Sequence, residues 1–200
     1  LPLQEGERAR VLELMRQQSQ RMQSLVDDLL TLARLEGSPR PPADAWWSLD
    51  DLLDLVQAEA QGLSAGRHEF VWPQARTGLA LAGVDSEVHS ALTNLLSNAV
   101  RYTPPQGCIS LSLERLEDGG LQLSVQDNGP GIAAEHLPRL TERFYRVDGS
   151  RSRATGGTGL GLSIVKHICQ RHGGQLRIES EVGRGSRFSL CWPANRVRSA

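Results

Sequence analysis

Two glycine-bearing runs constrain the fold of this chain more than any other feature. The first is Asp127-Asn128-Gly129-Pro130-Gly131-Ile132, and the second is Gly156-Gly157-Thr158-Gly159-Leu160-Gly161-Leu162. The alternating apolar residues 121–126 predict a strand that ends at Asp127. Because glycine accepts positive φ and proline fixes its own φ, the residues after Asp127 predict a tight turn.

The chemistry of the two runs suits the two ends of a nucleotide. A carboxylate at a strand end can accept a hydrogen bond from an amino group such as that of adenine. The second run leads into residues 160–168, whose apolar spacing is helical. Small residues at a helix start let backbone N–H groups approach phosphate, and the helix dipole favours negative charge. The pair therefore predicts a nucleotide pocket.

Each run alone has a simpler interpretation. The first alone is typical of a surface turn, and the second of a flexible loop. The second run is not a P-loop, because no lysine follows a second glycine at the required place. It is not a dinucleotide fingerprint either, because no strand leads into it. A third element is needed to make the pattern specific.

The composition excludes several classes of protein. The chain has 200 residues, 39% hydrophobic, with a mean hydropathy of -0.33, which suits a globular domain plus an appendage. A net charge of -1 argues against nucleic acid as a partner. Cys108, Cys169 and Cys191 are odd in number and widely spaced, so we expect reduced core thiols. No apolar run reaches the ~18 residues that span a membrane. Since the chain starts at Leu1 and shows no signal peptide, we expect a piece of a longer protein.

Residues 1–36 are predicted to form a long helix of a helical bundle, followed by a linker over residues 37–45. Seven residues, all apolar but one, follow each other at alternating spacings of four and three, which is the period of a helix-packing seam. The seam consists of Val11, Met15, Gln18, Met22, Leu25, Leu29 and Leu32. Leu14, Val26, Leu30 and Leu35 widen it, which favours a multi-helix bundle and a partner helix or second chain.

Residues 46–194 are predicted to form one α/β (α+β) domain, a two-layer sandwich with a mixed sheet and helices on one face. Ser48 is expected to cap a helix over 49–61. Further helices are expected at 85–102 and 160–172, with a short one at 135–142. Strands are expected at 46–49, 68–72, 79–82, 108–115, 121–126, 175–181 and 186–192. Residues 144–158, with Arg146, Arg151 and Arg153, are expected to form a mobile lid, and 195–200 a frayed tail.

The helix at 85–102 supplies the third element. Asn94 and Asn98 are four residues apart, so their amides share one face, and Arg101 lies on the same side before Tyr102 ends the helix. Two carboxamides offer neutral oxygens to a hard cation such as Mg²⁺ beside phosphates. Hydrogen bonds in helix packing would explain the asparagines equally well.

Four motifs in order give the chain a family resemblance. Residues 94–102 resemble the N box of sensor histidine kinases, 127–132 the G1 box, 143–146 the F box and 157–165 the G2 box. Residues 25–36 resemble the second helix of the dimerisation and phosphotransfer hairpin, most like the phosphate-sensing branch. The resemblance implies the ATP-binding fold shared with gyrase, Hsp90 and MutL.

The resemblance also implies a role for each matching residue. Asp127 would hold the adenine amino group, Asn98 would be the main Mg²⁺ ligand and Asn94 would support it. Arg101 would lie near the phosphates, Tyr102 would pack near adenine and Phe144 would anchor the lid. The remaining nucleotide-binding positions are Gly129, Gly131, Ile132, Gly157, Thr158, Gly159, Leu160, Gly161 and Leu162. Asn94, Asn98 and Arg101 are the expected catalytic residues, and ATP and Mg²⁺ the expected cofactors.

The expected activity is transfer of the γ-phosphoryl group to a histidine. In ATP-hydrolysing relatives a Glu stands at the place of Asn94, and an amide cannot act as a base near neutral pH. The five histidines (His68, His89, His136, His167 and His172) all lack the context of a phosphoacceptor. We therefore expect the acceptor helix to lie outside this chain.

Two other functions remain open at this stage: a hydrolase or anti-sigma serine kinase of the same fold, and a non-catalytic nucleotide-sensing module. For the kinase, the expected partners are ATP, the phosphoacceptor helix, a response regulator and a second copy of the chain through the bundle. The expected location is a cytoplasmic domain, anchored in the bacterial inner membrane by a segment outside this chain.

Overall fold

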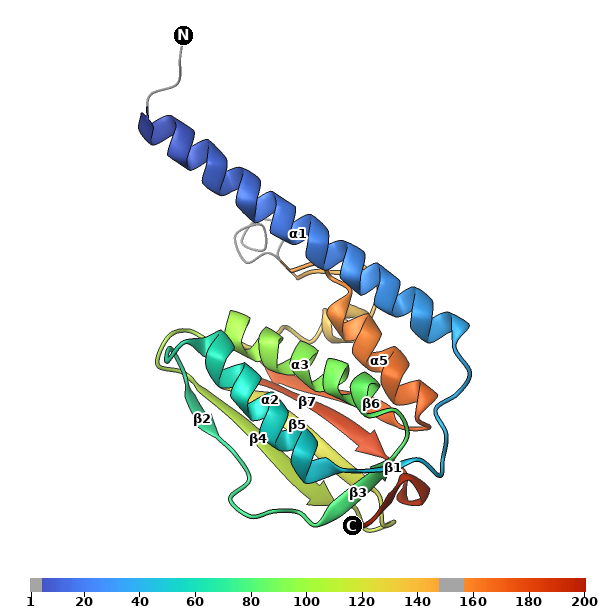
Figure 1. The fold of residues 1–200 in the computed structure, drawn as a ribbon. Helices are drawn as coiled ribbons and strands as arrows, with labels where there is room; N and C mark the ends of the chain where they lie inside the picture. Colours follow the sequence, from blue (N-terminus) through green and yellow to red (C-terminus); the bar gives the residue numbers. More distant parts are fainter. Residues whose placement is uncertain (1–4, 148–156) are drawn as a thin grey trace.

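The computed structural model describes residues 5–147 and 157–200, so the expected lid arginines Arg151 and Arg153 lie outside the described residues (Figure 1). A long helix α1 (Glu5–Gly37) precedes a two-layer domain. In that domain α2 (Leu49–Ser64), α3 (Asp85–Tyr102) and α5 (Gly161–Arg171) cover one face of a sheet. Across the described ranges, no helix is long and apolar enough to cross a membrane.

The main sheet has five strands in the order β2-β4-β5-β7-β6. Their bounds are β2 Glu69–Val71, β4 Cys108–Arg115, β5 Leu121–Asp127, β6 Gln175–Glu181 and β7 Gly185–Trp192. β2 pairs parallel to β4, and the other pairs are antiparallel. The predicted α+β class and mixed sheet are confirmed.

A second, smaller sheet corrects two predictions. β1 (Trp46–Ser48) and β3 (Leu79–Ala82) do not join the main sheet but pair with each other and with β8 (Val197–Ser199). The predicted frayed tail is therefore wrong in the described structure. A single turn of 3₁₀ helix, η2 (Ala194–Arg196), leads into β8, and Val197 is buried.

The core lies between the helices and the main sheet. β5 is buried along most of its length because it is the central strand, and its inward residues face the apolar sides of α3 and α5. Ser48 caps α2 as predicted, accepting from Asp51 N–H at 3.3 Å. The predicted helix at 135–142 is only the 3₁₀ turn η1 (Leu137–Arg139), because Pro138 supplies no N–H.

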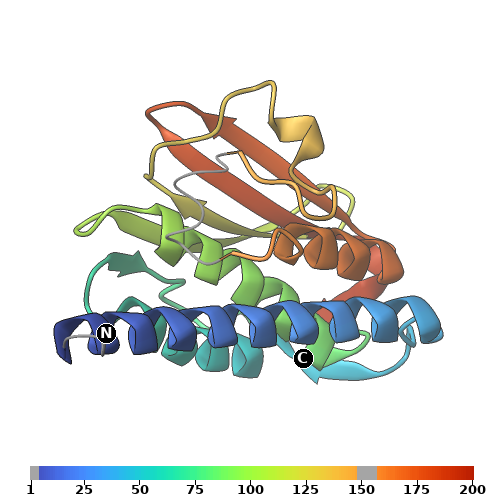
Figure 2. The same cartoon turned by 90° about the horizontal axis from the view of Figure 1, so that it is seen from above.

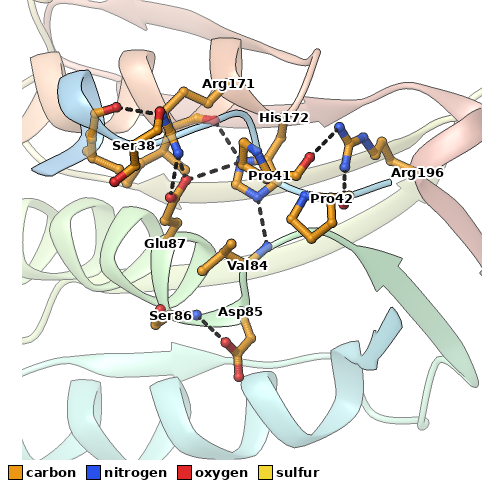
Figure 3. A network of polar contacts seen from close by, with 12 residues as sticks. Ser38, Pro41, Pro42, Val84, Asp85, Ser86, Glu87, Arg171, His172 and Arg196 are labelled. Atoms are coloured by element: carbon orange, nitrogen blue, oxygen red, sulfur yellow. Dashed lines mark hydrogen bonds and ion pairs between the residues drawn. The ribbon is translucent and has the colours of Figure 1, made fainter. Parts of the chain in front are cut away.

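The linker after α1 is fastened to the domain by two arginines (Figure 3). Arg171 donates to the carbonyl oxygens of Leu35, Ser38 at 3.0 Å and Pro39 at 2.8 Å. Arg196 donates to the carbonyl oxygens of Pro42 at 2.6 Å and Pro41 at 3.1 Å. Backbone acceptors that no helix or strand uses are thus satisfied, and the path of the linker is defined.

Glu87 and His172 hold Arg171 in place. The Arg171 guanidinium forms a two-pronged pair with Glu87, at 3.0 and 3.2 Å, and both side chains are largely buried. His172 is fully buried, and its Nε2 accepts from Val84 N–H at 3.2 Å while Nδ1 donates to Ile168 O (Figure 3). Burial lowers the pKa of His172, which agrees with a neutral ring that accepts at Nε2.

Among the residues that the structure describes, it is the C-terminal part of α1 that packs on the domain. Figures 1 and 2 both place this part alongside α5, where Leu32 and Leu35 are buried and Arg143 pairs with Glu36. Leu25 packs against the core while partly exposed, whereas Val11, Met15, Met22 and Leu29 of the stripe are exposed. The predicted seam thus remains open to a partner along most of its length.

The pairing of β8 predicts a cost for truncating its buried side chain. We expect Val197→Ala to lower the free energy of unfolding by roughly 1–2 kcal/mol, because it removes buried methyl groups. Urea denaturation measures the loss. Ser199→Ala on the same strand is the control, since Ser199 is exposed. Equal stability of both variants and the parent would mean that the tail is frayed after all.

Candidate nucleotide-binding site

A cavity of about 480 Å³ opens between α1, α3, the turn after β5 and the start of α5. It gathers most of the predicted site residues. Those that line it are Asn94, Asn98, Arg101, Tyr102, Asp127, Gly131, Ile132, Gly157, Thr158, Gly159, Gly161 and Leu162. A volume of this size suits a small molecule such as a nucleotide.

One end of the cavity is built around Asp127. This carboxylate is only 7% exposed at the end of β5, and its Oδ1 accepts from Gly129 N–H at 2.8 Å. Burial raises the pKa of Asp127, and the backbone N–H groups of Gly129 and Ser186 oppose that rise. When ionised, the carboxylate can only accept hydrogen bonds, so this end suits an amino group.

The turn beside Asp127 requires its second glycine. Gly131 has a φ of +70°, and a Cβ there would lie 2.0 Å from the carbonyl oxygen of Glu181. No side chain fits at that position without moving the neighbouring backbone. The predicted turn chemistry is therefore confirmed for Gly131, since the turn packs backbone to backbone on the hairpin between β6 and β7.

Asn94 and Asn98 of α3 both line this cavity. Asn94 Nδ2 donates to Ser90 O at 2.9 Å, which turns its Oδ1 away from its own helix. A Cβ at Gly161 would lie 2.6 Å from that oxygen, so the amide meets the first turn of α5. Oxygen donors on this face fit a hard cation beside phosphates. Within the described residues, no group of three His, Cys, Asp or Glu could hold a metal ion.

The second glycine run also lines the cavity and lies beside arginine side chains. A Cβ at Gly157 would lie 2.8 Å from Nη1 of Arg101, and Arg146 donates to the Gly157 carbonyl oxygen. Burial lowers the pKa of Arg146, and the positive charges of Arg21 and Arg101 lower it further. An anion bound here would relieve that repulsion, as phosphate would.

Three predicted residues contribute without lining the cavity. Gly129 donates its N–H to Asp127, Leu160 is fully buried in the core, and Phe144 contacts the glycine run through its backbone. Phe144 N–H donates to Gly159 O at 2.9 Å, while its side chain is 58% exposed. In this structure the Phe144 side chain is therefore not packed as an anchor.

Helix α1 adds residues that the sequence did not indicate as part of the site. Ser24 and Asp28 line the cavity one helical turn apart, and Thr158 donates to Asp28 Oδ2 at 2.5 Å. Burial raises the pKa of Asp28, while the bond from Thr158 opposes the rise. The spacing of four between Ser24 and Asp28 shows that they share one face of α1. The local sequence does not show that this face packs on the domain. Ser186 and Phe188 of β7 also line the cavity.

The fold and the site together define a nucleotide-binding domain with an adenine-compatible end and a phosphate-compatible end. Residues 83–196 match the family described as histidine kinase-, DNA gyrase B-, and HSP90-like ATPase. The chain is 47% identical over 191 residues to the phosphate regulon sensor protein PhoR of Pseudomonas aeruginosa, covering 96% of this chain and 43% of that protein. It is 37% identical over 177 residues to the sensor-like histidine kinase SenX3 of Mycobacterium tuberculosis, covering 88% and 43%.

Solved structures agree with these relatives. Full-length ShkA, solved with AMPPNP, matches with a TM-score of 0.75 and 26% identity over 100% of this chain and 41% of that chain. The mycobacterial sensor histidine kinase MprB matches with a TM-score of 0.64 and 26% identity over 74% and 95%. This chain therefore belongs to the histidine kinase-, DNA gyrase B- and HSP90-like ATPase family, as the catalytic ATP-binding domain of a two-component sensor histidine kinase. It spans less than half the length of the curated relatives it matches.

The contact between Asp28 and Thr158 predicts that α1 restrains nucleotide binding. Asp28→Asn should raise the affinity for ATP by roughly 3- to 10-fold, because it removes a negative charge from the phosphate end and weakens one hydrogen bond. Isothermal titration calorimetry measures the change. Asp27→Asn, on the exposed side of the same helix, should leave the affinity unchanged. An Asp28→Asn affinity equal to that of the parent would contradict the prediction.

Proposed function

We propose that this chain holds Mg-ATP and passes the γ-phosphoryl group to a histidine on the first helix of a dimerisation hairpin outside the chain. The observation that carries the proposal is the Asn94 amide, whose oxygen meets the first turn of α5 where hydrolytic relatives keep a Glu. Without a base to activate water, the site favours transfer over hydrolysis. The phosphoryl group would then pass to an aspartate of a response regulator.

The magnesium part of the proposal rests on the two amides of α3. Asn98 would be the main ligand and Asn94 the supporting one, since neutral oxygens complete the shell of a cation already held by phosphates. When bound, Mg²⁺ would neutralise phosphate charge. Asn94 suits this role because its Nδ2 is already bonded to Ser90 O, so the oxygen is the atom that faces away from α3.

The chain's own residues would act by binding and orientation. Asp127 would accept from the adenine amino group, and Tyr102 would pack near the ring. Arg101, together with the backbone N–H groups of the glycine run, would hold the phosphates and stabilise charge that develops during transfer. These are positioning and electrostatic effects, and none needs a proton acceptor within this chain.

The longer protein would place this domain in a signalling assembly. We propose the division into a bundle helix over 1–36, a linker over 37–45 and an ATP-binding domain from 46, with β8 included. The exposed stripe of α1 supports a homodimer through the bundle. We further propose a cytoplasmic domain that is anchored in the inner membrane by a segment outside this chain.

Phosphotransfer in trans tests the activity. Incubated with radiolabelled ATP, Mg²⁺ and a separately supplied acceptor-helix protein, the chain should label the acceptor histidine while releasing free phosphate slowly. The control is an acceptor with its histidine replaced by alanine. Fast phosphate release would favour the hydrolase alternative, label on serine the anti-sigma kinase, and binding without transfer the nucleotide-sensing module.

Substitutions at the two ends of the cavity test the site. Asp127→Asn should weaken ATP binding by about 10-fold or more, because a charge-assisted hydrogen bond to the base is lost. Asn98→Ala should abolish the dependence of binding on Mg²⁺, measured by calorimetry with and without a chelator. Asp118→Asn, in the exposed turn between β4 and β5, is the matched control. An intact affinity in Asp127→Asn would refute the assigned role.

A further inference from the structure

The hairpin between β6 and β7 grips the turn that follows β5. Gly183 N–H donates to Pro130 O at 2.8 Å, and Ile132 N–H donates to Ser180 Oγ at 2.8 Å. A Cβ at Gly185 would lie 2.0 Å from the carbonyl oxygen of Asp127. The hairpin therefore sets the position of the base-side end of the cavity.

Ser180 stands at the centre of this contact, and all of its hydrogen-bonding capacity is used. Its Oγ donates to Gly185 O at 2.9 Å and lies 2.9 Å from Ser186 Oγ. A hydroxyl has one hydrogen, and that of Ser180 goes to a carbonyl that can only accept. In the serine pair, Ser186 must therefore be the donor. Ser180 then accepts from both Ile132 N–H and Ser186 O–H, which fills its two lone pairs.

The direction of this bond decides what Ser186 offers to a ligand. Ser186 lines the cavity together with Asp127. Because its hydrogen is committed to Ser180, only its lone pairs are left for the cavity. The Asp127 carboxylate also only accepts when ionised. The base-side end thus presents two acceptors.

Two acceptors discriminate between purines. A 6-amino purine such as adenine brings N–H donors to them. A 6-oxo purine such as hypoxanthine brings a carbonyl oxygen at the same ring position, where lone pairs would face lone pairs. A site built to receive a donor rejects a ligand that leaves its buried polar groups unpaired.

We propose that Ser180 is a positioning residue for base specificity: it holds Ser186 as an acceptor and so makes the cavity select 6-amino over 6-oxo purine nucleotides. This inference rests on the proposed function, in which the Asp127 end of the cavity holds the base. It concerns a residue outside the cavity lining that acts through its neighbour.

The ratio of ATP to ITP affinity tests the proposal, measured by calorimetry on the whole chain. In Ser180→Ala the Ser186 hydroxyl loses its acceptor and can turn its hydrogen toward the 6-oxo group. The parent should prefer ATP, and in Ser180→Ala this preference should fall by about 3- to 10-fold. If the substitution only loosened the turn, it would weaken the binding of both nucleotides equally. The ratio of ATP to ITP affinity would then stay unchanged, which would overturn the proposal. Ser180→Thr keeps the hydroxyl and should restore the parent ratio.

The matched control is Ser189→Ala on β7. It removes a buried hydroxyl bonded to Ser124 Oγ at 2.8 Å that does not line the cavity, so its ratio should equal that of the parent. A fallen ratio in this control would overturn the assignment to Ser180. If Ser180→Ala does not fold, Ser186→Ala replaces it, since it removes the acceptor itself, and an unchanged ratio would again overturn the proposal.

The same titrations separate the inference from the function beneath it. A parent chain that binds neither nucleotide refutes the proposed function, and the inference falls with it. A parent that binds ATP while Ser180→Ala keeps the parent ratio refutes the inference alone.

Discussion

The end of the cavity around Asp127 depends on one buried carboxylate that is hydrogen-bonded by backbone N–H groups. Asp127 ends the central strand of the main sheet, where an unpaired charge would be costly. The backbone N–H groups of Gly129 and Ser186 offset part of that cost. The chain passes very close to Asp127 on both sides: a Cβ at Gly129 would lie 2.8 Å from its Oδ1, and one at Gly185 would lie 2.0 Å from its carbonyl oxygen. Glycines of two separate segments, the turn after β5 and the start of β7, therefore make room for the backbone around the Asp127 carboxylate.

Strong local signals explain what could be predicted. The helix around Asn94 and the strand before Asp127 have clear periods, so their bounds follow from the sequence to within a residue. The spacing of the asparagines and the two glycine runs are also local patterns, and they predicted most of the residues that line the cavity. The patterns that indicate these residues are local, although their roles were assigned from the family resemblance and their contacts reach distant segments, as Gly131 does at Glu181.

The features that could not be predicted from the sequence depend on contacts between segments that are far apart in the chain. β8 is three residues long with only Val197 buried, too short for alternation to distinguish it from a tail. Nothing in the spacing of β1 and β3 shows that they leave the main sheet, since partner choice is a tertiary property. The sequence did not indicate Asp28 as a site residue for a similar reason. Its burial depends on how α1 packs on the domain, and the helical period of α1 does not predict that packing.

The placement of α1 connects the phosphate-compatible end of the cavity to the exposed apolar stripe of the helix. The helix is held at two levels, by the bond between Asp28 and Thr158 and by the bonds from Arg171 to the carbonyl oxygens of Leu35 and Ser38. A helix is stiff over such a distance, so α1 cannot tilt against the domain without stretching one of these two contacts. At the contact between Asp28 and Thr158, phosphate oxygens would compete with Asp28 for the Thr158 hydroxyl. The exposed apolar stripe lies on the same helix, α1. In the proposed function, nucleotide occupancy and helix pairing would therefore act on the same helix. Coupling between them requires only that phosphate and Asp28 bind Thr158 with different free energies.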